Sequence, residues 1–269
     1  MCDEYGIDTI SAGLTISFLM ECFERGLINT SHTDGISIEF GDDAAAIQCL
    51  EKIVMRDGVG FLWGEGIRRL AEQIAGSGSF AMHCKGLEMG GYESRGFYGQ
   101  AQAFAINPKG GDHHAFGLPA RSEAAAGTQK NITGKGEEIK KAAIDRIIGD
   151  SLVLCCFPRK ITVPLYPDLI SALTGFAVDD EELNRIGWRI LTKERLFNTR
   201  EGLRREDDTL PERLLNEPLP EGPNRGSTVP LEKLKDDAYT ALGWEIATGI
   251  PQKRLLKKLN IDIELNEGI

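Results

Sequence analysis

No apolar run in this 269-residue sequence approaches the roughly 18 residues that a membrane span needs. A signal peptide would begin basic and then turn apolar, whereas this chain begins with the acidic stretch MCDEYGID. Basic residues are also in the minority. The formal net charge of −10 argues against a nucleic acid or an anionic membrane as a partner. These absences predict a cytoplasmic protein.

Cysteine is too sparse for a disulfide framework. The six cysteines are scattered at positions 2, 22, 49, 84, 155 and 156. In a reducing compartment such thiols are expected to be free or bound to metal. Two of them are adjacent in GDSLVLCCF, residues 149–157, where the local sequence leaves core packing, a disulfide and metal ligation all open.

Strand patterns are scarce as well. Alternation of apolar and polar residues is convincing only in ISIEF (36–40) and ITVPL (161–165). Apolar residues recur mostly at helical spacing, which predicts three helices across residues 9–76. Further helices are predicted over residues 97–106, 137–157, 169–176, 181–197 and 231–247. The fold class is therefore mainly α, with a proline-rich surface segment over residues 200–230.

Familiar hydrolase motifs are missing. The sequence has no HExxH, no paired CxxC and no GxSxG, so zinc and serine hydrolase functions lack support. KGGDHHAFG (109–117) does place two histidines after a glycine pair, where backbone can approach a bound ligand closely. Histidine can transfer a proton near neutral pH, although a solvated loop is the alternative interpretation.

Two distant segments share one pattern. DEYGID (3–8) and DSLVLC (150–155) each begin with aspartate and end in aspartate or cysteine. The simpler interpretation makes Asp8 a helix N-cap and Cys155 a core residue.

The order of several blocks resembles the central and C-terminal part of the tungsten-dependent aldehyde:ferredoxin oxidoreductase family. The blocks are CDEYGIDTISAG, CKGLE, SRGFYGQA, KGGDH, DSLVLC, FNTREG, REDDTLPER and GWEIATGIP. The resemblance covers essentially the whole chain. It implies two packed helical domains: residues 1–90 as the remainder of a central helical domain and residues 91–269 as the C-terminal helical domain. The family's N-terminal pterin domain would be absent from this chain.

The resemblance also implies the roles of individual residues. In that family each of two Asp-x-x-Gly-Leu-Asp/Cys segments holds one of the two pterin dithiolenes that chelate tungsten. Asp3, Asp8 and Asp150 would accordingly bind pterin. The cysteine of the second segment, here Cys155, would also ligate a 4Fe-4S cluster, and Cys156 would only pack.

Two further positions follow from the same resemblance. The family's proton-transferring histidine near the metal would correspond to His113, with His114 as the alternative. The second segment has Val153 where the family has glycine, which makes close backbone approach to the pterin less secure there.

The implied function is the oxidation of aldehydes to carboxylic acids with ferredoxin as electron acceptor. The tungsten-bispterin site (tungstopterin) and the 4Fe-4S cluster would both be incomplete in this chain alone. In the family three more cluster cysteines come from a C-x-x-C-x-x-x-C run upstream of the first segment, and the spacing of the other cysteines here does not reproduce it. The isolated chain is therefore expected to be inactive. It would be one half of a split enzyme, with the N-terminal half encoded separately, or the product of a truncated or degenerate gene.

An alternative is a cofactor-free helical binding or assembly module derived from this family. The sequence leaves open the identity of the aldehyde, the choice between tungsten and molybdenum, and whether the protein forms a homodimer.

Overall fold

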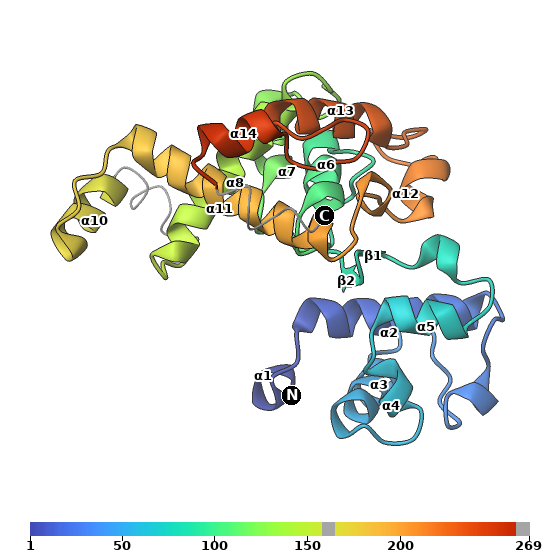
Figure 1. The fold of residues 1–269 in the computed structure, drawn as a ribbon. Coiled ribbons are helices and arrows are strands. Elements are labelled where there is room, and N and C mark those ends of the chain that lie inside the picture. The colour runs from blue at the N-terminus through green and yellow to red at the C-terminus, as the bar shows by residue number, and fades with distance from the viewer. Residues whose placement is uncertain (158–164, 262–269) are drawn as a thin grey trace. The chain divides into compact units, whose positions relative to one another are not determined.

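The computed structural model describes residues 1–157 and 165–261, and it confirms a mainly helical fold (Figure 1). The chain forms two compact units, which are described here one at a time. Unit 1 comprises Met1–Arg95, Lys109–Asp112 and Thr209–Val229. Unit 2 comprises Gly96–Pro108, His113–Asp208 and Pro230–Ile269. Each unit combines segments that are distant in the sequence, and the domain boundary expected after residue 90 stays a prediction.

The centre of unit 1 is α2 (Thr9–Glu24). The helix begins at Asp8, whose side chain accepts a hydrogen bond from the Ser11 amide, and it ends just before Gly26, as its apolar spacing predicts. Its buried face, which includes Leu19, packs into the apolar core of the unit. The other elements of unit 1 are α1 (Cys2–Tyr5), η1 (Thr30–His32), α3 (Asp43–Met55), α4 (Gly60–Trp63), α5 (Ile67–Gln73), η2 (Gly78–Phe80), β1 (His83–Cys84), β2 (Leu87–Glu88) and α12 (Glu212–Asn216).

The third of the helices expected over residues 9–76 is in fact two short helices, α4 and α5. Gly66 separates them with a φ of 85°, a left-handed conformation in which a right-handed helix cannot continue. The carboxylate of Glu88, which is buried, accepts a hydrogen bond of 2.8 Å from the Ile67 amide. A residue of the later hairpin thus satisfies an amide in the first turn of α5.

The strand predicted for ISIEF is wrong. Residues 36–40 form no strand, although Ile38 is fully buried in the core of unit 1. The apolar residues do not share one buried side, since Phe40 is 55% exposed. ITVPL falls almost entirely on residues 158–164, which lie outside the described residues. Within the two described ranges, no helix has both the length and the apolar composition to cross a membrane.

The block CKGLE forms a two-stranded antiparallel hairpin. Cys84 of β1 lies opposite Leu87 of β2, and both residues of the loop 85–86 have positive φ, as a type I′ turn requires. The chain at residues 110–111 lies directly on this hairpin. A Cβ on Gly110 would lie 2.2 Å from the Cys84 carbonyl oxygen, and one on Gly111 2.4 Å from the Leu87 carbonyl oxygen. Only glycine permits this approach.

Unit 2 is built around α6 (Tyr98–Ile106), whose residues from Gly99 to Ile106 are all buried. α8 (Lys135–Ser151) packs against α11 (Asp180–Arg200) and α13 (Leu231–Leu242), and α13 also packs on α6 (Figure 1). The remaining elements of unit 2 are α7 (Pro119–Ala126), α10 (Tyr166–Thr174), η4 (Arg205–Asp207) and α14 (Lys253–Lys258).

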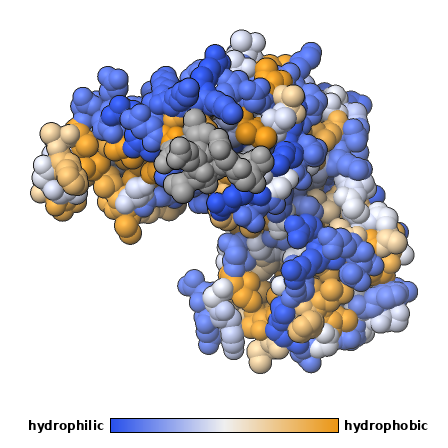
Figure 2. Space-filling view, viewed as in Figure 1, coloured by the Kyte–Doolittle hydropathy of each residue, from blue (hydrophilic) through white to orange (hydrophobic). Residues whose placement is uncertain are grey.

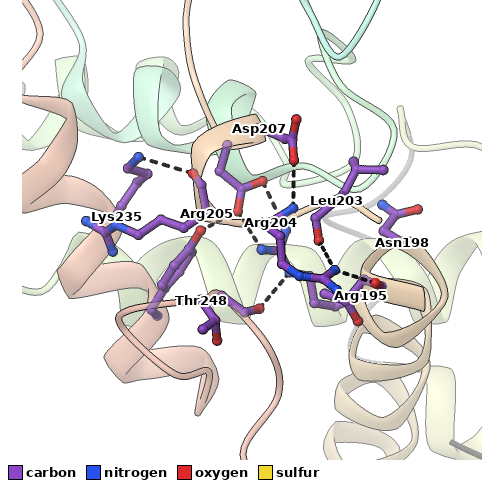
Figure 3. Close-up of polar contacts among 12 residues, drawn as sticks. Arg195, Asn198, Leu203, Arg204, Arg205, Asp207, Lys235 and Thr248 are labelled. Carbon is purple, nitrogen blue, oxygen red and sulfur yellow. Dashed lines mark hydrogen bonds and ion pairs between the residues drawn. The ribbon is translucent and has the colours of Figure 1, made fainter. Parts of the chain in front are cut away.

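A buried ion pair joins the closing segments of unit 2. Arg195 and Asp208, both 0% exposed, lie 2.8 Å apart, and the Tyr239 hydroxyl donates a hydrogen bond to Asp208. Arg195 Nε also donates to the Gly249 carbonyl at 2.8 Å. Figure 3 shows Arg195 among the polar side chains around η4. The blocks REDDTLPER and GWEIATGIP therefore meet in the interior of the unit.

This interior network corrects the expected surface segment over residues 200–230. Asp208 is fully buried in unit 2, and Leu210, Leu214 and Val229 are buried in unit 1. The prolines and charges of the segment had suggested solvent exposure, but its side chains alternate between solvent and the interior. Composition alone does not distinguish these two arrangements.

Candidate functional site: two matching helix-ending segments

The first segment, residues 3–8, joins α1 to α2. Gly6 ends α1 in the left-handed conformation, with φ 67°, and the Ile7 amide bonds the Cys2 carbonyl at 2.9 Å. Asp3 is exposed in the first turn of α1. Asp8 is exposed too, although one of its carboxylate oxygens caps α2. The helix-cap interpretation of Asp8 is thus confirmed, and the cap occupies only one of its two oxygens.

The second segment, residues 150–155, ends α8 in the same way. Val153 adopts the left-handed conformation with φ 58°, and the Leu154 amide bonds the Gly149 carbonyl at 2.9 Å. In both segments the carbonyl just before the aspartate accepts the amide five residues later, and the fourth residue of the segment is left-handed. This is the Schellman type of helix end. The two segments therefore share a local backbone conformation as well as a sequence pattern.

The left-handed conformation costs free energy at Val153 but not at Gly6, the equivalent position of the first segment. A β-branched residue with positive φ is strained, whereas Gly6 adopts the same conformation freely. We expect Val153→Gly to stabilise the chain by about 1 kcal/mol, because it removes the left-handed penalty. Chemical denaturation measures the change. Gly6→Val is the reciprocal control and should destabilise the chain by about 1–2 kcal/mol, since a Cβ there meets nothing within 4 Å and only the backbone penalty remains. A loss of stability in Val153→Gly would contradict this account.

Cys155 is an exposed free thiol, so its interpretation as a core residue is wrong. Apolar side chains are exposed on both sides of it, Val153 at 92% and Phe157 at 90%. Figure 2 shows further apolar surface over the α10 end of unit 2, where Leu173 and Phe176 are exposed. The most solvent-accessible thiol of the chain thus lies in an apolar stretch.

Cys156 is half-buried and has a polar partner. The Arg146 guanidinium forms an ion pair with Asp150 at 2.9 Å, and it also lies beside the Cys156 sulfur. Burial opposes the charge of Arg146, but the contacts with Cys156 and Asp150 outweigh this effect and raise its pKa above the ordinary value. The sequence analysis missed Arg146. Its signal was the helical i,i+4 spacing to Asp150, which favours an ion pair.

The three thiols buried in unit 1 differ sharply from Cys155. Burial raises the pKa of Cys22 and Cys84 to about 12 and that of Cys49 to about 11. Such thiols pack as small apolar side chains. All six cysteines of the chain are free. Within residues 1–157 and 165–261, no three His, Cys, Asp or Glu side chains gather into a group that could hold a metal ion.

The two adjacent histidines are the first residues of the second chain segment of unit 2, His113–Asp208. His113 and His114 are half-buried, with ring centroids 3.9 Å apart and planes tilted by 43°. The loop then folds inward, because Phe116 is buried and the Gly117 amide bonds the His114 carbonyl. The preceding glycine pair lies directly on the hairpin of unit 1, which accounts for glycine at both positions.

Unit 2 also contains a buried acid–base pair that sequence patterns did not reveal. Lys135 Nζ lies 2.6 Å from Glu123 Oε1, and both side chains are almost completely buried. The same oxygen accepts a hydrogen bond from the Gly99 amide at the start of α6. The pair ties α7 and α8 to the central helix, so we assign it a structural role.

Comparison with known proteins places this fold among oxidoreductases. The family model described as aldehyde ferredoxin oxidoreductase, domains 2 & 3, matches residues 1–261. A tungsten-containing aldehyde ferredoxin oxidoreductase of Pyrococcus furiosus is 36% identical, over 95% of this chain and 43% of the relative. That of Pyrococcus abyssi is 34% identical, over 97% of this chain and 44% of the relative. The chain therefore belongs to the aldehyde ferredoxin oxidoreductase family.

Two further comparisons define the extent of the match. An aliphatic sulfonate oxidoreductase, WOR-like subunit, of Pyrococcus furiosus is 31% identical, over 97% of this chain and 41% of the relative. The solved active-site complex BamBC of benzoyl coenzyme A reductase has the same fold, with a TM-score of 0.70 and 21% identity, covering 97% of this chain and 45% of that one. The chain spans less than half the length of the curated relatives that it matches.

Proposed function

We propose that this chain supplies the pterin-binding carboxylates and one cluster cysteine of an enzyme that oxidises aldehydes to carboxylic acids, with ferredoxin as electron acceptor. Membership of a family whose relatives are named for tungsten and for this reaction supports the proposal. The observation that carries it is the matching helix end of residues 3–8 and 150–155, because two equivalent turns suit two equivalent ligands.

The chemistry of the exposed groups fits a bispterin cofactor. Asp3 presents its carboxylate at the surface, and Asp8 retains one oxygen beyond its capping bond. Both oxygens of exposed Asp150 contact Arg146, and each keeps a further acceptor site. Ionised carboxylates accept hydrogen bonds from ring N–H groups of the kind that pterins carry. When bound, the tungsten centre would supply the two-electron oxidation of the aldehyde and the cluster would pass the electrons on. The residues of this chain bind and orient these groups.

Cys155 fits the role of cluster ligand among the thiols of this chain. It is exposed, whereas Cys22, Cys49 and Cys84 are buried with raised pKa values. A thiolate is the usual ligand of iron in such clusters. Since these 269 residues supply one of four expected ligands, we expect the chain by itself to be inactive and to need the remaining part of the family protein.

His113 is proposed to transfer a proton through an imidazole nitrogen. Its half-buried ring lies against that of His114, which limits the orientations it can take. Histidine exchanges protons near neutral pH, as aldehyde oxidation requires.

The proposal also includes a cytoplasmic location, which the six free thiols favour.

The test removes the carboxylates one at a time in the complete protein, that is, this chain combined with the part of the family's length that it does not span. Asp3→Ala and Asp150→Ala should each weaken cofactor retention roughly tenfold to a hundredfold, because a charge-assisted hydrogen bond is lost. Tungsten per protein by mass spectrometry and pterin by fluorescence measure this. Asp43→Ala and Asp168→Ala, at exposed helix starts, are the matched controls.

Two outcomes would contradict the proposal. Full cofactor retention in both Asp3→Ala and Asp150→Ala would favour the cofactor-free binding module. An equal loss in the two control variants would show that the effect is not specific to the segments.

A further inference from the structure

Arg146 holds Asp150 from one turn earlier in α8. Its Nε donates to Asp150 Oδ2 at 3.1 Å, and its Nη2 lies 2.9 Å from Oδ1. The contact is therefore bidentate, with the planar fork of the guanidinium facing both carboxylate oxygens. Only 20% of the Arg146 side chain is exposed, compared with 41% of Asp150.

The same guanidinium also lies beside the Cys156 sulfur, at the other end of the segment. One side chain thus contacts the first residue of the segment and the residue immediately after its last. Between these two contacts lies Val153, whose left-handed conformation is strained. Strained backbone persists only where its surroundings hold it, and Arg146 provides such a hold.

We propose that Arg146 is a positioning residue, which fixes the Asp150 carboxylate and, through Cys156, the backbone that presents the Cys155 thiol. This inference rests on the proposed function of Asp150 and Cys155. It gives Cys156 a role beyond packing, as the second anchor of Arg146. Since adjacent side chains project in different directions, anchoring Cys156 leaves Cys155 directed away from Arg146 and available to a ligand.

An ordinary surface ion pair is the competing explanation. Exposed pairs one helical turn apart contribute little, so their loss has almost no effect on local order. Arg185 and Glu182 form such a pair in α11. Arg146 differs from Arg185 because it is more buried and has a partner outside its own helix.

Hydrogen exchange of the full chain tests the anchoring without any cofactor. In Arg146→Gln, we expect the amide of Leu154, which bonds the Gly149 carbonyl, to exchange about tenfold faster. Arg146→Lys should give an intermediate rate, because lysine keeps the charge but not the fork. Arg185→Gln should leave this amide unchanged. An unchanged Leu154 rate in Arg146→Gln would overturn the proposal.

A second readout in the complete protein tests the link to the cofactors. Loss of the positive charge near Cys155 should lower the reduction potential of the cluster in Arg146→Gln, while Arg146→Lys retains it. If Arg146→Gln speeds exchange of the Leu154 amide but leaves the reduction potential of the cluster unchanged, the proposed effect of Arg146 on the cluster is wrong. Failure of the proposed function gives a different result. If Cys155 is not a cluster ligand, Cys155→Ser retains its iron, whatever the exchange rate of Leu154 in the Arg146 variants.

Discussion

Cys155→Ser is expected to remove the 4Fe-4S cluster from the complete protein, or make it labile, while Cys156→Ser retains it. The structure separates the two adjacent thiols. Cys155 is exposed in a segment that repeats the backbone of residues 3–8, whereas Cys156 is half-buried against Arg146. A serine hydroxyl is a poor ligand for iron, so the first substitution removes a ligand. The second substitution removes no ligand, and the smaller serine side chain can still accept a hydrogen bond from the nearby Arg146.

Iron content and aldehyde-dependent reduction of a viologen dye measure the difference between the variants. Cys155→Ser should fall below about one iron atom per protein, and Cys156→Ser should stay near the unsubstituted value. The opposite result, with the cluster lost only in Cys156→Ser, would mean that the segment is out of register by one residue. Val153, which stands in place of glycine, would then be the first position to reconsider.

Asp208→Asn is expected to destabilise the chain by about 3–5 kcal/mol. The substitution leaves Arg195 fully buried without its counter-charge, and an uncompensated buried charge is among the most costly defects in a protein. Burial raises the pKa of Tyr239 and persists in the variant, so the tyrosine stays neutral and does not replace the lost charge.

Denaturant unfolding, followed by tryptophan fluorescence, measures this loss, because the Arg195 guanidinium lies 4.6 Å from the ring centre of buried Trp244. Glu232→Gln is the matched control. Glu232 is 69% exposed and pairs with Arg205 and Lys235, so its loss should cost less than about 1 kcal/mol. Equal costs for Asp208→Asn and Glu232→Gln would show that the buried pair contributes no more than a surface one.

Local signals predicted the helices well, because helix formation depends on contacts between residues three or four apart. The apolar spacing after Asp8 predicted α2 and its N-cap, and the periodic stretch over residues 181–197 predicted α11. Strand prediction failed at ISIEF because a strand needs a partner that the sequence of one segment does not show. Ile38 is buried without any strand pairing.

The order of motifs in the sequence led to the family, and the comparisons confirmed it. The sequence also singled out the two segments, since each carries aspartate at its start and aspartate or cysteine at its end. It could not show that Val153 takes the same left-handed conformation as Gly6, because valine disfavours that conformation. The bond from Leu154 to Gly149 shows how the end of α8 imposes it.

By itself, the sequence determined the helical class, the family and the position of the candidate ligands, because these depend on spacing along the chain. The tertiary structure decided which of these groups are accessible and what holds them. It exposed Cys155 and buried Cys22, and it brought Arg195 onto Asp208. It also showed that Arg146 contacts both ends of one segment. These outcomes depend on burial and on contacts between groups that the local sequence does not bring together, so no pattern within one segment could reveal them.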